Sequence, residues 1–237
     1  MVDPFFRPVT ATASGGATSY DAGLRAHMQR VYNYMAGGLA VTGAIAYVVA
    51  HTALAVIIFG SPLKWLVMLG PLAFLFFLPG MQRYSMGQCQ ALFWSFCAMM
   101  GLSFSTIFFA YSQADIARAF FITAADFGAM SLYGYTTKRD LTSMAGFMLM
   151  GLLGLIIASV VNLFLMSSAL QWVVSVVSVV VFTGLTAYDV QRIKQSYDAG
   201  WGSDANGRLA ISGALSLYLD FINLFMSILR LTGNGRN

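Results

Sequence analysis

Charged residues are scarce in this 237-residue chain. Lys, Arg, Asp and Glu together make up 9% of it, whereas hydrophobic residues make up 58%. A water-soluble domain of this size carries roughly a quarter charged residues. The mean hydropathy is +0.72. This composition excludes an ordinary soluble domain and predicts an all-α polytopic membrane protein, with room for about seven spans of roughly 20 residues each.

Motifs of soluble enzymes are also missing. The chain contains no CxxC, no HExxH and no glycine-rich phosphate loop. Its two cysteines, Cys89 and Cys97, lie in one apolar run, where eight helical residues separate their Cα atoms by about 12 Å, too far for a disulfide. The thirteen Lys and Arg residues stand singly or in pairs. We therefore read the net charge of +4 as a topology signal and expect no nucleic-acid partner.

The first residues differ in composition from the rest. Residues 1–24 are rich in Ser, Thr, Ala and Gly, contain Pro4 and Pro8, and lack helical apolar periodicity. We expect a disordered tail there, followed by a single transmembrane domain at 25–237. No short apolar stretch with a small-residue cleavage site precedes Arg30, so the first span is expected to act as the insertion signal.

Seven apolar runs separated by short polar breaks predict seven helices. They lie at about 31–50, 63–81, 89–111, 117–135, 144–166, 170–188 and 209–231. The first run continues past His51 to Phe59, so it could also be one long tilted helix.

Orientation follows from the positive charges, because Lys and Arg are enriched in cytoplasmic loops. With the N-terminus inside, nine of the thirteen fall on the inner side and four on the outer side. The inner set is Arg7, Arg25, Arg30, Arg83, Lys138, Arg139, Arg192, Lys194 and Arg208, and the outer set is Lys64, Arg118, Arg230 and Arg236. The C-terminus is then expected outside.

Two apolar runs near the end of the chain each contain one aspartate. Asp189 lies in GLTAYDVQRIK at 184–194, and Asp220 in LSLYLDFINLFMSILRL at 215–231. A carboxylate inside a membrane-length apolar run costs about 2.5 kcal/mol or more, so such residues usually face the protein interior and serve a function. The alternative for Asp189 is an interfacial carboxylate paired with Arg192 on its own helix. The alternative for Asp220 is a purely structural hydrogen bond.

Two further charged residues leave alternatives open. Asp126 lies in the run at 117–135. It could line an internal polar path, or it could be a buried group satisfied by Tyr or Thr hydroxyls. Arg83 closes the second run, where a snorkelling topology residue is the default and a partner for Asp189 is the sharper hypothesis.

Three stretches carry a resemblance to a known family. They are FGAMSLYGYTTKRDL at 127–141, GLTAYD at 184–189 and LSLYLDFINLF at 215–225. They look like the signature sequences of the Bax inhibitor-1 family, also called the transmembrane BAX inhibitor motif family, in its bacterial branch. The resemblance covers most of the chain after about residue 80, whereas the first 60 residues match only in hydropathy.

The resemblance implies a seven-helix fold in which six helices surround a central C-terminal helix, and a pH-sensitive calcium leak across the bacterial inner membrane. It also implies that the family's di-aspartyl sensor falls on Asp189 and Asp220. The arginine that the family places against the first aspartate falls on Arg83. Asp126 falls in no motif of the family.

A carboxylate pair suits a proton switch. Two carboxyls within a few Å in a poorly solvated site cannot both ionise cheaply, so they share one proton and titrate as a unit. Deprotonated, Asp189 and Asp220 could hold Ca²⁺ transiently, although two carboxylates fall short of the six to eight oxygens of a tight site. Spacing opposes their meeting, because Asp189 is expected about 5 Å deep and Asp220 about 18 Å. They meet only if the last helix sits shallower or tilts, or if the segment at 191–194 continues the preceding helix inward.

The sequence therefore predicts a non-enzymatic cation leak or transporter gated by the aspartate pair. One alternative is an intramembrane aspartyl protease, because Tyr188-Asp189 matches the YD of that enzyme class and two aspartates on consecutive helices form its catalytic arrangement. The GxGD motif of those enzymes is missing, since SLYL precedes Asp220 and no PAL follows it. Another alternative is a non-conducting regulator of a membrane protease or of another membrane complex.

Overall fold

The secondary structure is helical throughout the described part of the chain. The computed structural model describes residues 13–75 and 83–233, and for 13–20 and Leu75 only the backbone. These residues form nine helices and no strand, which confirms the all-α prediction. The helices are α1 (Ala13–Ala50), α2 (Leu54–Phe59), α3 (Leu63–Leu75), α4 (Met86–Phe104), α5 (Ile107–Ala110), α6 (Gln113–Thr136), α7 (Thr142–Leu165), α8 (Ser168–Gln195) and α9 (Ser203–Thr232).

Five stretches are long and apolar enough to cross a membrane. They are Asp21–Ala50 in α1, Met86–Ala110 covering α4 and α5, and the whole of α7, α8 and α9. A stretch of about 20 mostly apolar residues spans a bilayer, and these have 24 to 30 residues. The chain is therefore an integral membrane protein.

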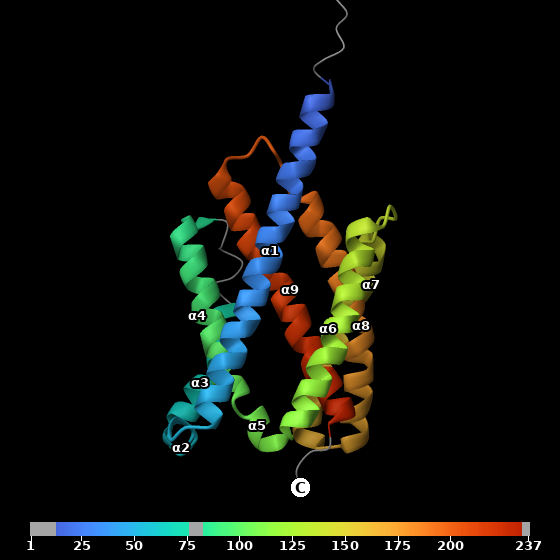
Figure 1. Ribbon diagram of the computed structural model, residues 1–237. Helices are drawn as coiled ribbons and strands as arrows, with labels where there is room; N and C mark the ends of the chain where they lie inside the picture. The colour runs from blue at the N-terminus through green and yellow to red at the C-terminus, as the bar shows by residue number, and fades with distance from the viewer. Residues whose placement is uncertain (1–12, 76–82, 234–237) are drawn as a thin grey trace, which may run out of the picture.

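Helix α9 is the most buried of the five candidate membrane spans. In its most apolar window 67% of the residues are buried, compared with 6% in α7. It packs against α1, α4, α6 and α8, and it crosses behind α1 and α6 in Figure 1. Its neighbours include the fully buried Phe93 and Phe96 of α4, whose rings lie 6.4 and 5.9 Å from the ring of Tyr218. Any polar group on the inner faces of α9 is thus shielded from lipid.

The first helix differs from its predicted bounds. Helix α1 begins at Ala13, so residues 13–24 of the predicted tail are helical, whereas residues 1–12 lie outside the described residues. Extending an existing helix adds one hydrogen bond per residue and needs no new nucleus, which favours continuation through Ala- and Ser-containing sequence. At the other end α1 stops at Ala50, and α2 is a separate helix.

Serine and threonine side chains cap several helices of the bundle and lie at one helix break. Ser85, Ser112 and Ser167 each accept a hydrogen bond at a helix N-terminus, from Gln88 N, Asp115 N and Leu170 N. The run at 89–111 breaks where Ser105 Oγ and Thr106 Oγ1 donate to the carbonyls of Leu102 and Ser103. Such local bonds compete with the helical ladder. The short polar breaks of the sequence thus become caps and breaks in the structure.

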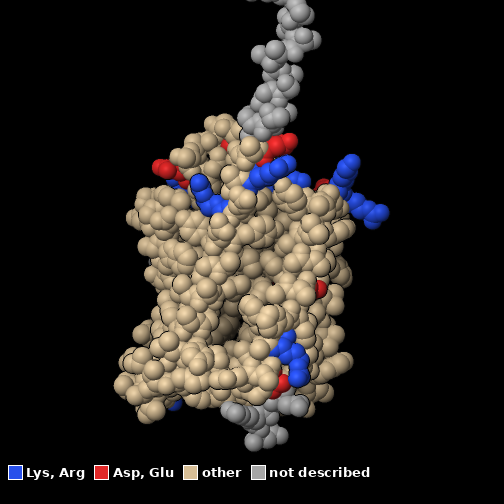
Figure 2. All heavy atoms as spheres, in the orientation of Figure 1, with Lys and Arg blue, Asp and Glu red and all other residues tan. Residues whose placement is uncertain are grey.

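Charged side chains gather at one end of the bundle. Figure 2 shows blue and red atoms concentrated at the end from which α1 starts, and few on the flanks. The connections between α6 and α7 and between α8 and α9 lie at this end in Figure 1, while α9 ends at the opposite end. The fold therefore collects residues of the predicted inner set on one side.

Candidate functional site

Asp189 sits near the end of α8 in an ion pair with its own helix. Its Oδ1 lies 3.2 Å from Nη2 of Arg192, and the Asp189 side chain is only 13% exposed. The i, i+3 spacing places both side chains on one helix face. Arg192 also lies over the ring of Tyr188, 5.7 Å from its centroid. The carboxylate is therefore held in place by a guanidinium from the next helical turn.

Arg192 also connects α8 to α9. Its Nη2 donates a hydrogen bond of 3.1 Å to Ser216 Oγ, which lies one helical turn before Asp220 on α9. The guanidinium suits this double role because it presents several donors in a fixed plane. The ion pair of α8 is thereby joined to the helix that carries the second aspartate.

Asp220 is a buried carboxyl with an unpartnered oxygen. The residue is 6% exposed, and its Oδ2 has no hydrogen-bond partner among the described residues. It lies within electrostatic range of both Asp189 and Arg192. Burying an ionised carboxylate without partners is costly, so this group is poised to hold a proton or to attract a cation. The structure thus brings the two predicted aspartates near each other.

The length of α8 explains how the two aspartates come together despite their unequal predicted depths. The helix continues to Gln195, seven residues beyond the predicted end of its apolar run, and α9 starts at Ser203, upstream of its own run. Continuation through 191–194 was one of the conditions for the meeting, and the structure satisfies it. Asp189 therefore lies six residues before the end of the helix rather than at its tip.

Side chains on this extension fasten it to the connection between α6 and α7. Gln191 accepts a hydrogen bond from Leu141 N at 3.0 Å and donates one to Arg139 O at 2.8 Å. Lys194 Nζ donates to Tyr135 O at 2.8 Å, at the last turn of α6. A cation at a helix C-terminus also compensates the partial negative charge there. Sequence reasoning counted Lys194 only as a topology residue and assigned Gln191 no role.

Backbone contact between α6 and α8 sets the position of Asp189 from another side. A Cβ on Gly134 of α6 would meet the backbone carbonyl of Ala187, two residues before Asp189. Only a glycine allows this approach, which is how small residues let membrane helices pack closely. Gly134 lies in the FGAMSLYGYTTKRDL stretch, so that motif contributes to the site by packing.

Arg83 does not take the place predicted for it. It is exposed, and among the described residues the ion pair of Asp189 is made by Arg192 instead. Arg192 wins because it is one turn away on the same helix, whereas Arg83 lies on a separate segment beside residues 76–82, which are outside the described part. The prediction that Arg83 pairs with Asp189 is therefore corrected, and the same-helix alternative holds.

Asp126 is satisfied by a hydroxyl group, which is the second of the two alternatives that the sequence left open. Its Oδ2 accepts a hydrogen bond of 2.8 Å from Thr183 Oγ1, which joins α6 to α8. The residue is half-buried. A threonine hydroxyl thus satisfies this carboxyl, as expected for a structural group in a membrane helix.

The aspartate pair is not a complete metal site. Within residues 13–75 and 83–233, no three His, Cys, Asp or Glu residues come together at metal-ligand distance. Asp189 and Asp220 supply carboxylate oxygens, the hard ligands that Ca²⁺ prefers, but too few for tight binding.

Comparison with known proteins agrees with the sequence motifs. Residues 24–237 match the family described as "Inhibitor of apoptosis-promoting Bax1". An uncharacterized protein of Rickettsia prowazekii is 44% identical over 234 residues, which cover 96% of this chain and 98% of that protein. The inner membrane protein YbhL of Escherichia coli K12 is 43% identical over 220 residues, covering 91% and 94%. An uncharacterized membrane protein of Streptococcus pyogenes is 34% identical over 222 residues, covering 92% and 96%.

Proposed function

Since this chain belongs to the Bax inhibitor-1 family of membrane proteins, we propose that it is a pH-sensitive cation leak, with Ca²⁺ as the transported ion and Asp189 and Asp220 as the gate. The observation that carries the proposal is the unpartnered carboxyl oxygen of Asp220, buried in the innermost helix and within range of Asp189. A site of this kind takes up either a proton or a cation, and the two compete.

The proposed gate includes Arg192 in place of Arg83. When the pair is deprotonated, Arg192 binds Asp189 more strongly and, through Ser216, holds α8 against α9. Protonation of the pair weakens this attraction. In this scheme Asp126 fastens α6 to α8 through Thr183 and does not line the path.

We propose the family's seven-span arrangement for this bundle. The five apolar stretches are then joined by α3, a shorter apolar helix, and by α6, whose 24 residues suffice for a crossing. The N-terminus is proposed to be cytoplasmic and the C-terminus outside, because the predicted inner set of positive residues gathers at the end where α1 begins. The inner membrane is the proposed location, as for the relative YbhL.

We propose no enzymatic activity. An aspartyl protease needs both carboxyls free to act on one water, one as base and one as acid. Here the Asp189 carboxylate is in an ion pair with Arg192, whose Nη2 lies 3.2 Å from Asp189 Oδ1. Incubating the purified protein with a helical membrane substrate should give no cleavage. Cleavage that either aspartate-to-asparagine variant abolishes would overturn this part of the proposal.

A flux assay tests the leak directly. In liposomes loaded with a calcium indicator, the purified protein should pass Ca²⁺ at a rate that changes between about pH 6 and pH 8, where a carboxylate pair that shares a proton releases it. Asp220→Asn and Asp189→Asn should each flatten the dependence, because an amide keeps the shape but neither takes up the proton nor carries the charge. The double variant should add little, as expected for groups that act as a unit.

A matched control is available on the same helix. Asp204 lies exposed in the first turn of α9, so Asp204→Asn removes one carboxylate from that helix but not from the pair. It should keep the pH dependence of the wild type. Flux that is absent at every pH, with correctly folded protein, would exclude the leak and favour a non-conducting regulator of a membrane protease or other complex.

A further inference from the structure

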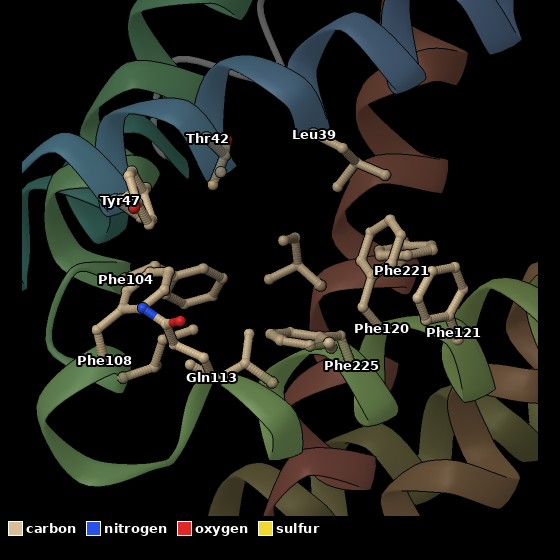
Figure 3. A pocket seen from close by; sticks show the side chains of 16 residues that line it. Leu39, Thr42, Tyr47, Phe104, Phe108, Gln113, Phe120, Phe121, Phe221 and Phe225 are labelled. Atoms are coloured by element: carbon tan, nitrogen blue, oxygen red, sulfur yellow. The ribbon is translucent and has the colours of Figure 1, made fainter. Parts of the chain in front are cut away.

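An apolar cavity of about 370 Å³ lies between α1 and α6, where both helices pack on α9. Sixteen residues line it, and Figure 3 shows their side chains, ten of them labelled, around an open space. Leu39, Thr42 and Tyr47 come from α1, and Phe221 and Phe225 from α9. The volume falls within the range of pockets that hold small apolar ligands.

Aromatic rings make the cavity walls rigid. Phe120 of α6 packs edge-on against Phe221 of α9, with ring centroids 5.7 Å apart. At the other end Phe108 packs edge-on against Tyr47 of α1, with centroids 6.0 Å apart. Edge-to-face pairs of this kind stabilise beyond the area they bury. The cavity is therefore a built feature of the bundle rather than a loose gap.

The interior of the cavity is dry. The Thr42 hydroxyl donates to Cys97 O at 2.9 Å and accepts from the Tyr218 hydroxyl at 2.7 Å, so its polar atom is satisfied by the protein. None of the buried unpartnered polar atoms of the described residues belongs to a lining residue. A cavity without polar partners does not hold water. The occupant must be apolar, which also keeps the proposed ion path out of this space.

The cavity opens toward the lipid. The rim residues Phe121 and Tyr47 are 71% and 52% exposed. Figure 2 shows the surface hollowed between the positions of α1 and α6, in the half of the bundle nearer the C-terminus. Hydrocarbon surrounds this flank of a membrane-spanning bundle. The apolar molecule with access to the opening is therefore the acyl chain of a membrane lipid.

The dimensions fit one acyl chain. The lining residues run from Leu39 to Tyr47 on α1 and from Gln113 to Phe121 on α6, and eight residues of helix rise about 12 Å. One leaflet contributes about half of a hydrocarbon thickness of about 30 Å. At the end of the bundle, Gln113 Nε2 lies 3.3 Å from His51 Nε2, so polar groups stand where a lipid headgroup would lie.

We infer that this cavity is a binding site for one acyl chain of a phospholipid, which enters between α1 and α6 and contacts α9 at Phe221, the residue next to Asp220. The bound chain supplies the dispersion contacts that the walls lack when the space is empty. It differs from lipid that coats the outer surface, because residues of α1 and α6 enclose it and its inner end meets α9.

Gly43 provides a way to fill the site. It lines the cavity, and a Cβ at this position meets no atom within 4 Å. Gly43→Phe should therefore occupy the space without displacing the backbone. Ala117→Phe does the same from the opposite wall on α6. Gly154→Phe is the matched control, because Gly154 on α7 also has no atom within 4 Å of its Cβ position and lies outside the cavity.

The test is photocrosslinking of the full chain in bilayers that contain a phospholipid with a diazirine in its acyl chain. We expect crosslinks to concentrate on the peptides that contain residues 39–47 and 221–225. Gly43→Phe and Ala117→Phe should each lower these crosslinks about tenfold, a change equivalent to roughly 1.4 kcal/mol of binding. Gly154→Phe should leave them unchanged.

A stability measurement separates loss of the site from misfolding. Returning phospholipid to delipidated wild-type protein should raise its melting temperature, since a ligand that binds the folded state stabilises it. Folded Gly43→Phe protein should gain less, because the phenyl ring already fills the space. Crosslinks spread evenly over exposed helix faces such as α7, and insensitive to both filling variants, would mean surface lipid only and would overturn the inference.

Discussion

At the scale of single residues, Arg192 decides how the aspartate pair is held. It binds Asp189 and, through Ser216, ties α8 to α9. We expect Arg192→Ala to raise the basal leak at neutral pH by up to about fivefold, because a half-exposed ion pair contributes at most about 1 kcal/mol. The measurement is calcium flux into liposomes at fixed pH.

Two other cations serve as comparisons for that variant. Lys138 is exposed in the connection between α6 and α7, so Lys138→Ala removes the same charge without touching the pair. We expect neither Lys138→Ala nor Arg83→Ala to change the leak. An Arg83→Ala effect as large as that of Arg192→Ala would restore Arg83 to the gate.

Sequence reasoning found the two aspartates but not their arrangement. A carboxylate in an apolar run stands out in the sequence because placing it in the membrane interior is energetically costly, and Asp189 and Asp220 were found that way. The partner of Asp189 was left open between Arg192 and Arg83, because spacing alone does not rank an arginine on the next turn against one on another helix. Ser216 was missed because a serine in a membrane helix carries no comparable cost.

A buried hydroxyl pair joins three helices at the residue scale. Thr42 of α1 bonds both Cys97 O on α4 and the Tyr218 hydroxyl on α9. Thr42→Val keeps the shape but leaves the buried Tyr218 hydroxyl without its partner, at a cost of about 1–3 kcal/mol. We expect the melting temperature in detergent to fall by about 2–4 °C for each kcal/mol. Thr136→Val, at an exposed threonine whose hydroxyl bonds only within α6, should have little effect, and an equal loss in both variants would contradict this account.

At the scale of elements, the contact between α6 and α8 depends on one missing side chain. Gly134→Ala would push a methyl group against the Ala187 carbonyl, and overpacking of this kind costs about 1–3 kcal/mol. We expect a lower melting temperature and a flatter pH response of the leak, because Asp189 moves with Ala187.

The control for this substitution lies six residues earlier on the same helix. A Cβ on Gly128 meets no atom within 4 Å. Alanine in a helix is then favoured over glycine by about 0.4–1 kcal/mol, so Gly128→Ala should be neutral or stabilising. Thermal melts of the two variants should therefore move in different directions. A drop for both would mean that helix propensity, rather than contact with α8, governs this face.

The presence of each helix was easier to predict from the sequence than the residues at which it begins and ends. Hydropathy located each apolar run because burial in lipid requires it, and every predicted run overlaps a helix in the structure. The sequence left open whether α8 extends to Gln195. The extension depends on hydrogen bonds that Gln191 and Lys194 make with the connection between α6 and α7 and with the end of α6. Hydropathy does not register bonds between segments that are distant in the chain. The separation of α4 from α5 was missed for a related reason, since it arises from local hydroxyl bonds of Ser105 and Thr106.

At the scale of the whole molecule, the two ends of the chain should lie on opposite sides of the membrane. A reporter fused at Asn237 should report an outside location, and one inserted in the connection at 196–202 an inside one. The reason is the positive charge gathered on the side of that connection. Reporters on the same side would mean that α9 does not cross.

The attachment of α8 to the connection between α6 and α7 has a mechanical consequence. The Gln191 amide bonds to this connection and the Lys194 ammonium to the end of α6, so we expect α6, α7 and α8 to move together. Thr42 in the same way joins α1 and α4 to α9. Any motion between these two groups of helices would therefore fall at the contacts of α8 and α6 with α9. Asp220 is buried on α9 and within range of Asp189 on α8, so the proton uptake proposed for this pair would act where the two groups of helices meet.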